Sequence, residues 1–219
     1  MNKKVLVIAA HPDDEWLGCG GTLLKHLKEK DTVFAVFVSD GFSSRDEEKT
    51  QLDRNKACIE LMKTISAEDP YFMNFPDNQL DKIPRLEIIK EIEKIKKEIK
   101  PNIVYTHYCD DLNIDHRIVS DCVHTAFRPQ PGEEAEVILQ FEVLSATDWT
   151  FLKPFSPNLF IDITDYLEEK IELLKFYEGE MKDTPHSRSV DNVRNLALLR
   201  GSTVGRRAAE ALIVSRLIS

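Results

Sequence analysis

The sequence predicts an α/β fold, a doubly wound and mostly parallel sheet flanked by helices, as one domain over residues 1–219. Apolar runs of strand length alternate with amphipathic runs of helix length along most of the chain. A length of 219 residues suits one large domain with a substantial core. No internal repeat or low-complexity segment divides the chain.

The first strand is expected at residues 4–10, which are apolar almost throughout. A run of this kind is typical of a strand that is buried on both faces of a parallel sheet. Antiparallel strands are compatible with the last third of the chain. The other expected strands lie at 32–39, 70–75, 101–107, 137–143 and 159–163.

Helices are expected between and after these strands, at 18–30, 46–66, 84–99, 115–127, 164–178 and 190–218. Apolar side chains in the third helix recur every three or four residues, which predicts one buried stripe: Leu86, Ile89, Ile92, Ile95 and Ile99. Asp115 is a candidate N-cap of the fourth helix. Residues 128–135 contain two prolines and a glycine and predict a loop.

The composition limits the classes of partner that the protein can have. A net charge of −9 argues against nucleic acid or an anionic membrane as the main partner. The chain has neither an apolar run of transmembrane length nor a signal-peptide pattern, and its four cysteines show no C-x-x-C spacing. We therefore expect a cytoplasmic protein with free thiols that acts on a small molecule, and a homo-oligomer is compatible with these features.

Titratable side chains follow two of the expected strands. His11-Pro12-Asp13-Asp14-Glu15 comes directly after the first strand, and a second acidic segment that ends in Asp115-His116 follows the strand at 101–107. Open α/β sheets bind ligands at the carboxyl ends of their strands, so the two segments would converge if the strands are close. Because buried charges are usually paired or bind metal, we expect a cation there. A His-Asp-His set with an open position is typical of a catalytic zinc site.

The carboxylates need separate roles. Asp13 and Asp14 are adjacent and point in different directions, so one can bind a metal while the other handles a proton. Asp115 is a candidate partner for a metal-binding imidazole, in addition to its possible cap. Glu15 either orients a ligand or caps the helix that follows.

Substrate-binding residues are expected in the loops. Arg128 and Arg188 each lie beside a loop that contains proline and are candidates for holding an anionic group. Ser43 follows the turn at 39–41, which ends the second strand and is expected to line the same pocket.

Several motifs together resemble the LmbE-like (PIG-L) family of zinc-dependent N-deacetylases. The most specific are Ala10-His11-Pro12-Asp13-Asp14-Glu15 with Gly18-Cys19-Gly20-Gly21-Thr22, and Asp111-Leu112-Asn113-Ile114-Asp115-His116-Arg117. Shorter matches are Ser39-Asp40-Gly41 with Ser44-Arg45, Phe127-Arg128-Pro129, and Arg200-Gly201-Ser202-Thr203-Val204-Gly205 with Ala208-Ala209-Glu210.

The resemblance implies a Rossmann-like fold and one zinc ion per chain, held by His11, Asp14 and His116. It makes Asp13 the general base. The implied reaction removes an N-acetyl group from an amino sugar, an N-acetylglucosamine-type conjugate, by means of a zinc-activated water.

One position departs from the family pattern. Many members carry a histidine three residues before the second zinc histidine, where it helps to stabilise the developing oxyanion, and this chain has Asn113 there. Either Asn113 donates a hydrogen bond in a weaker version of that role, or another histidine replaces it. His107 ends the strand that leads into this segment and is the favoured substitute, with His186 as the second candidate.

Two other functions stay open. The glycines at 18, 20 and 21 and Asp40 resemble a dinucleotide-binding unit, but the third glycine of G-x-G-x-x-G would fall at Leu23. The acidic segment between strand and glycines would also repel a pyrophosphate. The second alternative is a metal-binding family member with weak or no catalysis, because of Asn113.

Overall fold

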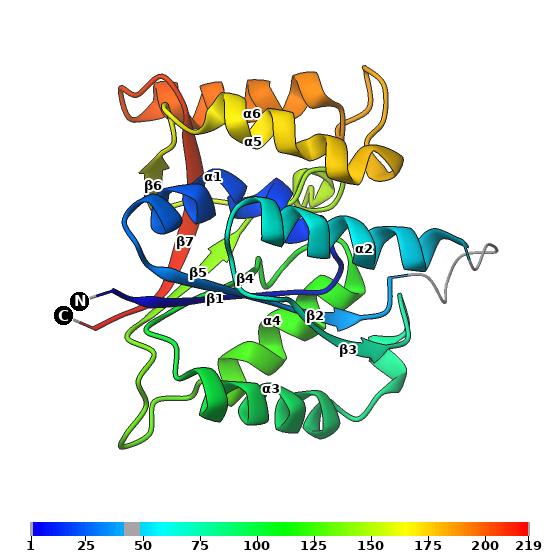
Figure 1. Ribbon diagram of the computed structural model, residues 1–219, viewed down its shortest axis with the longest axis vertical. Helices are drawn as coiled ribbons and strands as arrows, with labels where there is room; N and C mark the ends of the chain where they lie inside the picture. The colour runs from blue at the N-terminus through cyan, green and yellow to red at the C-terminus, as the bar shows by residue number, and fades with distance from the viewer. Residues whose placement is uncertain (1, 42–48, 219) are drawn as a thin grey trace.

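Seven strands form one sheet, in the order β3-β2-β1-β4-β5-β7-β6, in the computed structural model of the chain, which describes residues 2–41 and 49–218 (Figure 1). The strands are β1 Lys4–Ala9, β2 Thr32–Ser39, β3 Tyr71–Phe75, β4 Ile103–His107, β5 Val137–Phe141, β6 Leu159–Asp162 and β7 Ala209–Leu217. Strands β1 to β5 are parallel, and β7 pairs antiparallel with both β5 and β6. The predicted fold class and the late antiparallel strands are confirmed.

Helices cover both faces of the sheet. The α-helices are α1 Asp14–Lys28, α2 Lys49–Thr64, α3 Arg85–Ile99, α4 Ile114–Ala126, α5 Leu167–Leu173 and α6 Val190–Thr203. Short 3₁₀ helices lie at Leu80–Lys82, Thr147–Trp149 and Leu174–Glu180. In Figure 1, α3 and α4 lie below the sheet, whereas α1, α2, α5 and α6 lie above it. Within residues 2–41 and 49–218, no helix is both long enough and apolar enough to span a bilayer.

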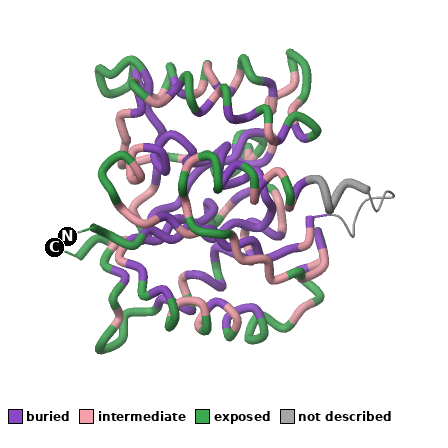
Figure 2. Tube along the Cα trace, in the orientation of Figure 1, coloured by how far each residue is buried: buried purple, intermediate pink, exposed green. Residues whose placement is uncertain are grey.

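Alternate side chains of β1 enter two separate cores. Val5 and Val7 join the core under α1 and α2, while Leu6 and Ile8 join the core over α3 and α4. Successive strand residues point to opposite faces, so a strand between two helix layers must be apolar at nearly every position. Figure 2 shows this arrangement as a buried centre between outward helix faces that are exposed.

The order in which the chain adds strands to the sheet changes side at β1. It proceeds from β1 outward to β2 and β3, and then crosses to β4 on the other side of β1. The carboxyl ends of β1 and β4 therefore flank the switch point, where open α/β sheets bind ligands.

Glycine at position 18 permits α1 to pack directly on the sheet. A Cβ atom on Gly18 would overlap the ring of Phe141 at the end of β5. Helix α1 begins at Asp14, four residues before the expected start, so Gly18 lies within a helix and not in a loop between strand and helix. This position explains the glycine by packing and does not favour a dinucleotide-binding loop.

The expected helix over residues 190–218 is wrong in its second half. Helix α6 ends at Thr203, a turn follows with Gly205 at φ 69°, and residues 209–217 form β7. Ala209 and Glu210 have good helix propensity, but pairing with both β5 and β6 outweighs it. The expected helix over 164–178 is α5 followed by the 3₁₀ helix at Leu174–Glu180.

Candidate active site

Polar side chains from β1, β4 and their neighbours meet at the switch point in what we call the strand-end pocket. Its lining includes the following residues: His11, Asp13, Asp14, Arg54, Asp77, Asn78, Asn113, His116, Ser145, Ala146 and Arg188. The pocket therefore combines the two segments that the sequence predicts to converge with residues from four other parts of the chain.

His11, Asp14 and His116 bring their ligand atoms together. His11 Nδ1 lies 3.0 Å from Asp14 Oδ2, and His116 Nε2 lies 3.3 Å from the same oxygen. One atom from each residue falls within 4.8 Å of the other two, and all three residues are buried. Two imidazole nitrogens and one carboxylate oxygen are the donor types of an open zinc site, so the residues present fit a divalent cation.

More carboxylates surround the two imidazoles on their far sides. His11 Nε2 lies 2.9 Å from Asp77 Oδ1 and 3.6 Å from Asp115 Oδ2, and His116 Nδ1 lies 3.3 Å from Asp111 Oδ1. Carboxylates in such positions fix the orientation and basicity of a ligand imidazole. Asp115 thus lies where a partner of a metal-binding histidine belongs.

The charges of this set are unequal. Burial lowers the pKa of His116, but the charges of Asp14 and Asp111 outweigh burial and raise it to about 9. Burial likewise opposes protonation of His11, yet hydrogen bonds to Asp115 and Asp14 raise its pKa well above the usual value. Burial also disfavours the Asp14 anion, but the two imidazoles hold its pKa well below the ordinary range. Without another cation, the surplus carboxylates hold protons on the imidazoles, and a metal ion would compete with those protons.

Asp13 occupies a strained and heavily bonded position. Its φ is 117°, and its backbone N–H donates to Glu15 Oε2 at 2.9 Å. Its Oδ2 accepts from Arg54 Nη2 at 3.0 Å and from Arg188 Nη1 at 2.7 Å. Burial raises the pKa of Asp13, although both guanidinium groups oppose the rise. Its Oδ1 is buried and has no hydrogen-bond partner among the described residues.

Glu15 supports Asp13 and does not approach the two histidines within bonding distance. Its second oxygen, Oε1, accepts from the hydroxyl of Tyr177 at 2.7 Å. Complete burial raises its pKa to about 8, although the hydrogen bond from Tyr177 opposes the rise. Of the two roles expected for Glu15, the structure favours support of the backbone at the start of α1.

Asn113, and not Asp115, is the N-cap of α4. Asn113 Oδ1 accepts from the backbone N–H groups of Asp115 at 2.8 Å and His116 at 3.4 Å. The predicted cap by Asp115 is wrong, because the carboxylate of Asp115 instead accepts from the N–H groups of Asn78 and Leu80. Since capping uses the Oδ1 of Asn113, its Nδ2 remains as the donor on a side chain that lines the pocket.

His107 and His186 lie outside the lining of the pocket. His107 is fully buried beneath His116, with ring centroids 3.9 Å apart, and its Nε2 accepts from Ala10 N–H at 2.8 Å. Burial and the neighbouring His116 keep its pKa well below the usual value, so it stays neutral. His186 packs against Trp149, and its Nδ1 accepts from Arg188 N–H. The structure therefore gives both histidines supporting contacts and does not bring either to the pocket.

The remaining substrate-binding candidates divide. Arg188 lines the pocket, but its guanidinium is engaged by Asp13 and by Ser145 Oγ. Arg128 lies at the far end of α4 from His116 and pairs there with Glu93. The structure therefore does not bring Arg128 to the pocket. Ser43 lies outside the described residues.

Asp77 and Arg54 are pocket residues that sequence reasoning missed. Asp77 follows β3 after a single proline, Pro76. The segment after β1 likewise has a proline directly before an acid, Pro12 before Asp13, so this order is a signal that the sequence offers. Arg54 lies within α2 and carries no local signal, because a lone arginine in a helix is most often a surface charge.

Comparisons with known proteins identify a matching family, related sequences and a shared fold. The sequence profile described as "GlcNAc-PI de-N-acetylase" (PIG-L) matches residues 6–127. A diacetylchitobiose deacetylase from Thermococcus kodakarensis is 25% identical over 96% of this chain and 82% of the relative. A protein described as the uncharacterized deacetylase YaiS from Escherichia coli K12 is 31% identical over 81% of this chain and 91% of the relative. The structure of N,N'-diacetylchitobiose deacetylase from Pyrococcus horikoshii superposes with a TM-score of 0.80 at 23% identity, covering 98% of this chain and 84% of the other, and shares the fold.

Proposed function

The chain belongs to the GlcNAc-PI de-N-acetylase (PIG-L) family, and from this premise we propose that it is a metal-dependent hydrolase that removes the N-acetyl group of an amino sugar. One observation carries the proposal. The buried carboxylate of Asp13 lies in the same pocket as the convergent His11, Asp14 and His116. We extend the assignment to the whole chain, residues 1–219, because Arg188 reaches the pocket from beyond the matched residues.

His11, Asp14 and His116 would hold one divalent ion, and zinc suits two imidazoles and one carboxylate. Such an ion, when bound, supplies Lewis acidity that polarises the acetyl carbonyl and makes water a better nucleophile near neutral pH. Asp77, Asp115 and Asp111 hold the two imidazoles by their outer nitrogens, so the ligand atoms keep their orientation.

Asp13 is the proposed general base. Its Oδ1 accepts a proton from the attacking water, and the same carboxyl group then gives that proton to the leaving amine. The proton balance closes, because cleavage of the C–N bond forms a carboxylic acid and an amine from an amide and one water.

Asn113 is the proposed donor to the oxygen of the acetyl group. Its Oδ1 is committed to the cap of α4, which leaves Nδ2 as a fixed neutral donor. A donor already in place stabilises negative charge as it develops, although Asn cannot carry a positive charge. Because neither His107 nor His186 lines the pocket, Asn113 is the better candidate of the three.

The relatives and the walls of the pocket support a proposal for the substrate class. Two of the similar proteins, those from Thermococcus kodakarensis and Pyrococcus horikoshii, are described as diacetylchitobiose deacetylases. The pocket here is lined mostly by polar groups, including Asp77 and Asn78, which suit the hydroxyls of a sugar ring. We propose an N-acetylglucosamine-type conjugate as substrate.

Acetate release tests the proposal. The full chain is stripped with a chelator, reloaded with one equivalent of zinc, and incubated with N-acetylglucosamine, N,N'-diacetylchitobiose and alkyl N-acetylglucosaminides. We expect one acetate and one free amine per turnover from at least one of them, and none from the stripped protein. Stoichiometric zinc binding without acetate from any of these substrates would contradict the deacetylase assignment and favour a metal-binding protein without this activity.

A further inference from the structure

Arg188 arrives at the pocket on a loop that is fixed at several points. The loop joins the 3₁₀ helix at Leu174–Glu180 to α6. Within it, the N–H of Arg188 donates to His186 Nδ1 at 3.0 Å, and its carbonyl accepts from Lys182 N–H at 3.1 Å. The loop is docked on the segment after β5, because Ser187 Oγ accepts from Ser145 N–H at 3.1 Å. Arg188 is thus presented by ordered backbone.

The guanidinium of Arg188 is held from two sides. Its Nε donates to Ser145 Oγ at 3.0 Å, and its Nη1 donates to Asp13 Oδ2 at 2.7 Å. The side chain is only 15% exposed. A guanidinium that binds an anionic substrate group needs its fork of parallel N–H donors free, and here one donor of the fork is already taken by Asp13.

Both arginines of the pocket bind the same oxygen of Asp13. Arg54 Nη2 reaches Oδ2 at 3.0 Å, and the rest of its guanidinium is tied to Glu180 and to the carbonyl of Gly41. The other oxygen of Asp13, Oδ1, receives no hydrogen bond from the described residues. Two charge-assisted donors on one oxygen fix the rotation of a carboxylate and leave its other oxygen open.

The backbone of Asp13 also needs external support. A φ of 117° is costly for a residue other than glycine and persists only where the surroundings hold it. Support comes from Glu15 on the backbone N–H and from Arg54 and Arg188 on the side chain.

We propose that Arg188 is a positioning residue for the reaction: it binds Asp13 Oδ2 so that Oδ1 is the oxygen that accepts the proton. The proposal rests on the deacetylase function proposed above. It replaces the expected role of Arg188 in substrate binding, and it ties the loop before α6 to the chemistry at the end of β1.

The kinetic test compares Arg188→Met, Arg188→Lys and a matched control, Arg194→Met. Arg194 also pairs with a carboxylate, that of Glu168, but it lies on α6 outside the pocket.

For Arg188→Met we expect kcat to fall by about 10²-fold, the size of effect that misplacement of a catalytic group produces. KM should change by less than about two-fold, since the lost contact does not touch the substrate. Arg188→Lys, or free guanidinium added to Arg188→Met, should recover part of kcat, and Arg194→Met should match wild type. A rise in KM with unchanged kcat would overturn the proposal in favour of substrate binding.

Crystal structures of wild type and Arg188→Met provide a readout that needs no turnover. We expect the Asp13 carboxylate to rotate or to take two orientations in the variant, while Arg54 and the loop backbone stay in place. An unchanged, single Asp13 orientation would overturn the positioning role even if kcat falls. If wild type releases no acetate, the proposed function fails, and the orientation of Asp13 still decides whether Arg188 positions it.

Discussion

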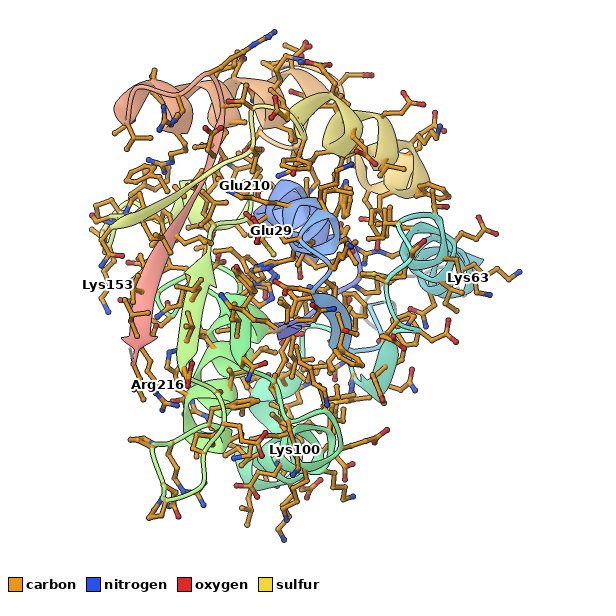
Figure 3. All side chains as sticks on the ribbon, turned by 60° about the vertical axis from the view of Figure 1, so that its left-hand side comes forward. Glu29, Lys63, Lys100, Lys153, Glu210 and Arg216 are labelled. Atoms are coloured by element: carbon orange, nitrogen blue, oxygen red, sulfur yellow. The ribbon has the colours of Figure 1, made fainter. Side chains whose placement is uncertain are left out.

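Two groups of buried charges contact α1, one at its N-terminus and one along its middle turns, and they differ in how completely they are satisfied. The ion pair of Lys170 and Glu210 is balanced: Lys170 Nζ donates to Glu210 at 2.6 Å and to the Leu17 carbonyl at 2.9 Å. Glu210 also accepts from the N–H groups of Gly21 and Thr22 and from the Thr22 hydroxyl. Figure 3 shows Glu210 inside the molecule beside α1, whereas Lys63 of α2 lies at the outer edge of the molecule.

The strand-end pocket is unbalanced by comparison. Four carboxylates, those of Asp14, Asp77, Asp111 and Asp115, lie around the imidazoles of His11 and His116, and the third imidazole nearby, that of His107, is kept neutral by burial. Asp13 keeps one buried oxygen open. Buried charge is tolerated where its partners are complete, as at Glu210, and an incomplete set indicates a ligand or a reaction. We therefore propose that the charges of the pocket are functional and that the Lys170–Glu210 pair is structural, although both groups are buried.

The largest expected effect comes from removing one of the proposed ligand histidines of the pocket. His116→Ala should lose the metal and reduce deacetylation by about 10⁴-fold or more, because the Lewis acid is worth several kcal/mol. Circular dichroism should show the fold retained. Elemental analysis after zinc loading checks the first point, and His124→Ala, on the same helix but outside the pocket, is the control. Full occupancy in His116→Ala would show that His116 is not a ligand.

Asp13→Asn separates the base from the metal ligands. The amide keeps the size of the side chain but cannot take up a proton, so kcat should fall by roughly 10²–10⁴-fold with metal content unchanged. Zinc analysis and initial rates on one protein sample check both statements. Near-normal turnover would mean that another group accepts the proton.

Glu210→Gln tests the balanced ion pair. The change leaves the Lys170 ammonium buried without its counter-ion, which should cost about 3–5 kcal/mol of unfolding free energy in urea titrations. Zinc stoichiometry and kcat of the folded fraction should stay at wild-type values. The control Glu168→Gln, which breaks an exposed pair with Arg194, should leave the stability unchanged. Loss of zinc in Glu210→Gln would break the distinction between the two groups.

Asn113→Asp keeps the cap of α4 and removes the donor. The carboxylate oxygen can still accept from the N–H groups of Asp115 and His116, but no N–H remains to face the acetyl oxygen. We expect kcat to fall by about 10²-fold with little change in KM or melting temperature. Asn113→His provides the opposite probe and should preserve or raise kcat. Wild-type kcat in Asn113→Asp would assign the donor role elsewhere.

The smallest effect concerns Glu142, a buried carboxylate that forms a two-point ion pair with Arg200. Burial raises its pKa in the folded state, although Arg200 opposes the rise. An acid with a raised folded pKa contributes stability below its unfolded pKa, and this contribution is lost as pH rises through the folded value. Unfolding free energies of wild type relative to Glu142→Gln should therefore decline from pH 4 upward. A constant difference across that range would contradict the shift.

The segments that follow β1 and β4 show how much of the site was predictable. Each carries its polar residues directly after a buried strand, and strand ends of a parallel sheet share one edge. The placement of His11, Asp14 and His116 in one pocket could therefore be expected, and the structure places them together. Asp77 followed the same rule after β3 and was overlooked.

What the sequence alone determined is local: strands that are apolar at nearly every position and the acidic segments at the strand ends. The stripe predicted for α3 is confirmed at Ile89, Ile92 and Ile99, but it is wrong at Leu86, which is 60% exposed while Ile88 is buried. Only the tertiary structure decided that residues 209–217 become a strand, because pairing with β5 and β6 outweighs the helix propensity of Ala209 and Glu210. It also decided that Arg188 meets Asp13 from 175 residues away. Periodicity and motif spacing report on neighbours within a few turns of chain, whereas the partner of a buried charge is chosen by how distant segments pack.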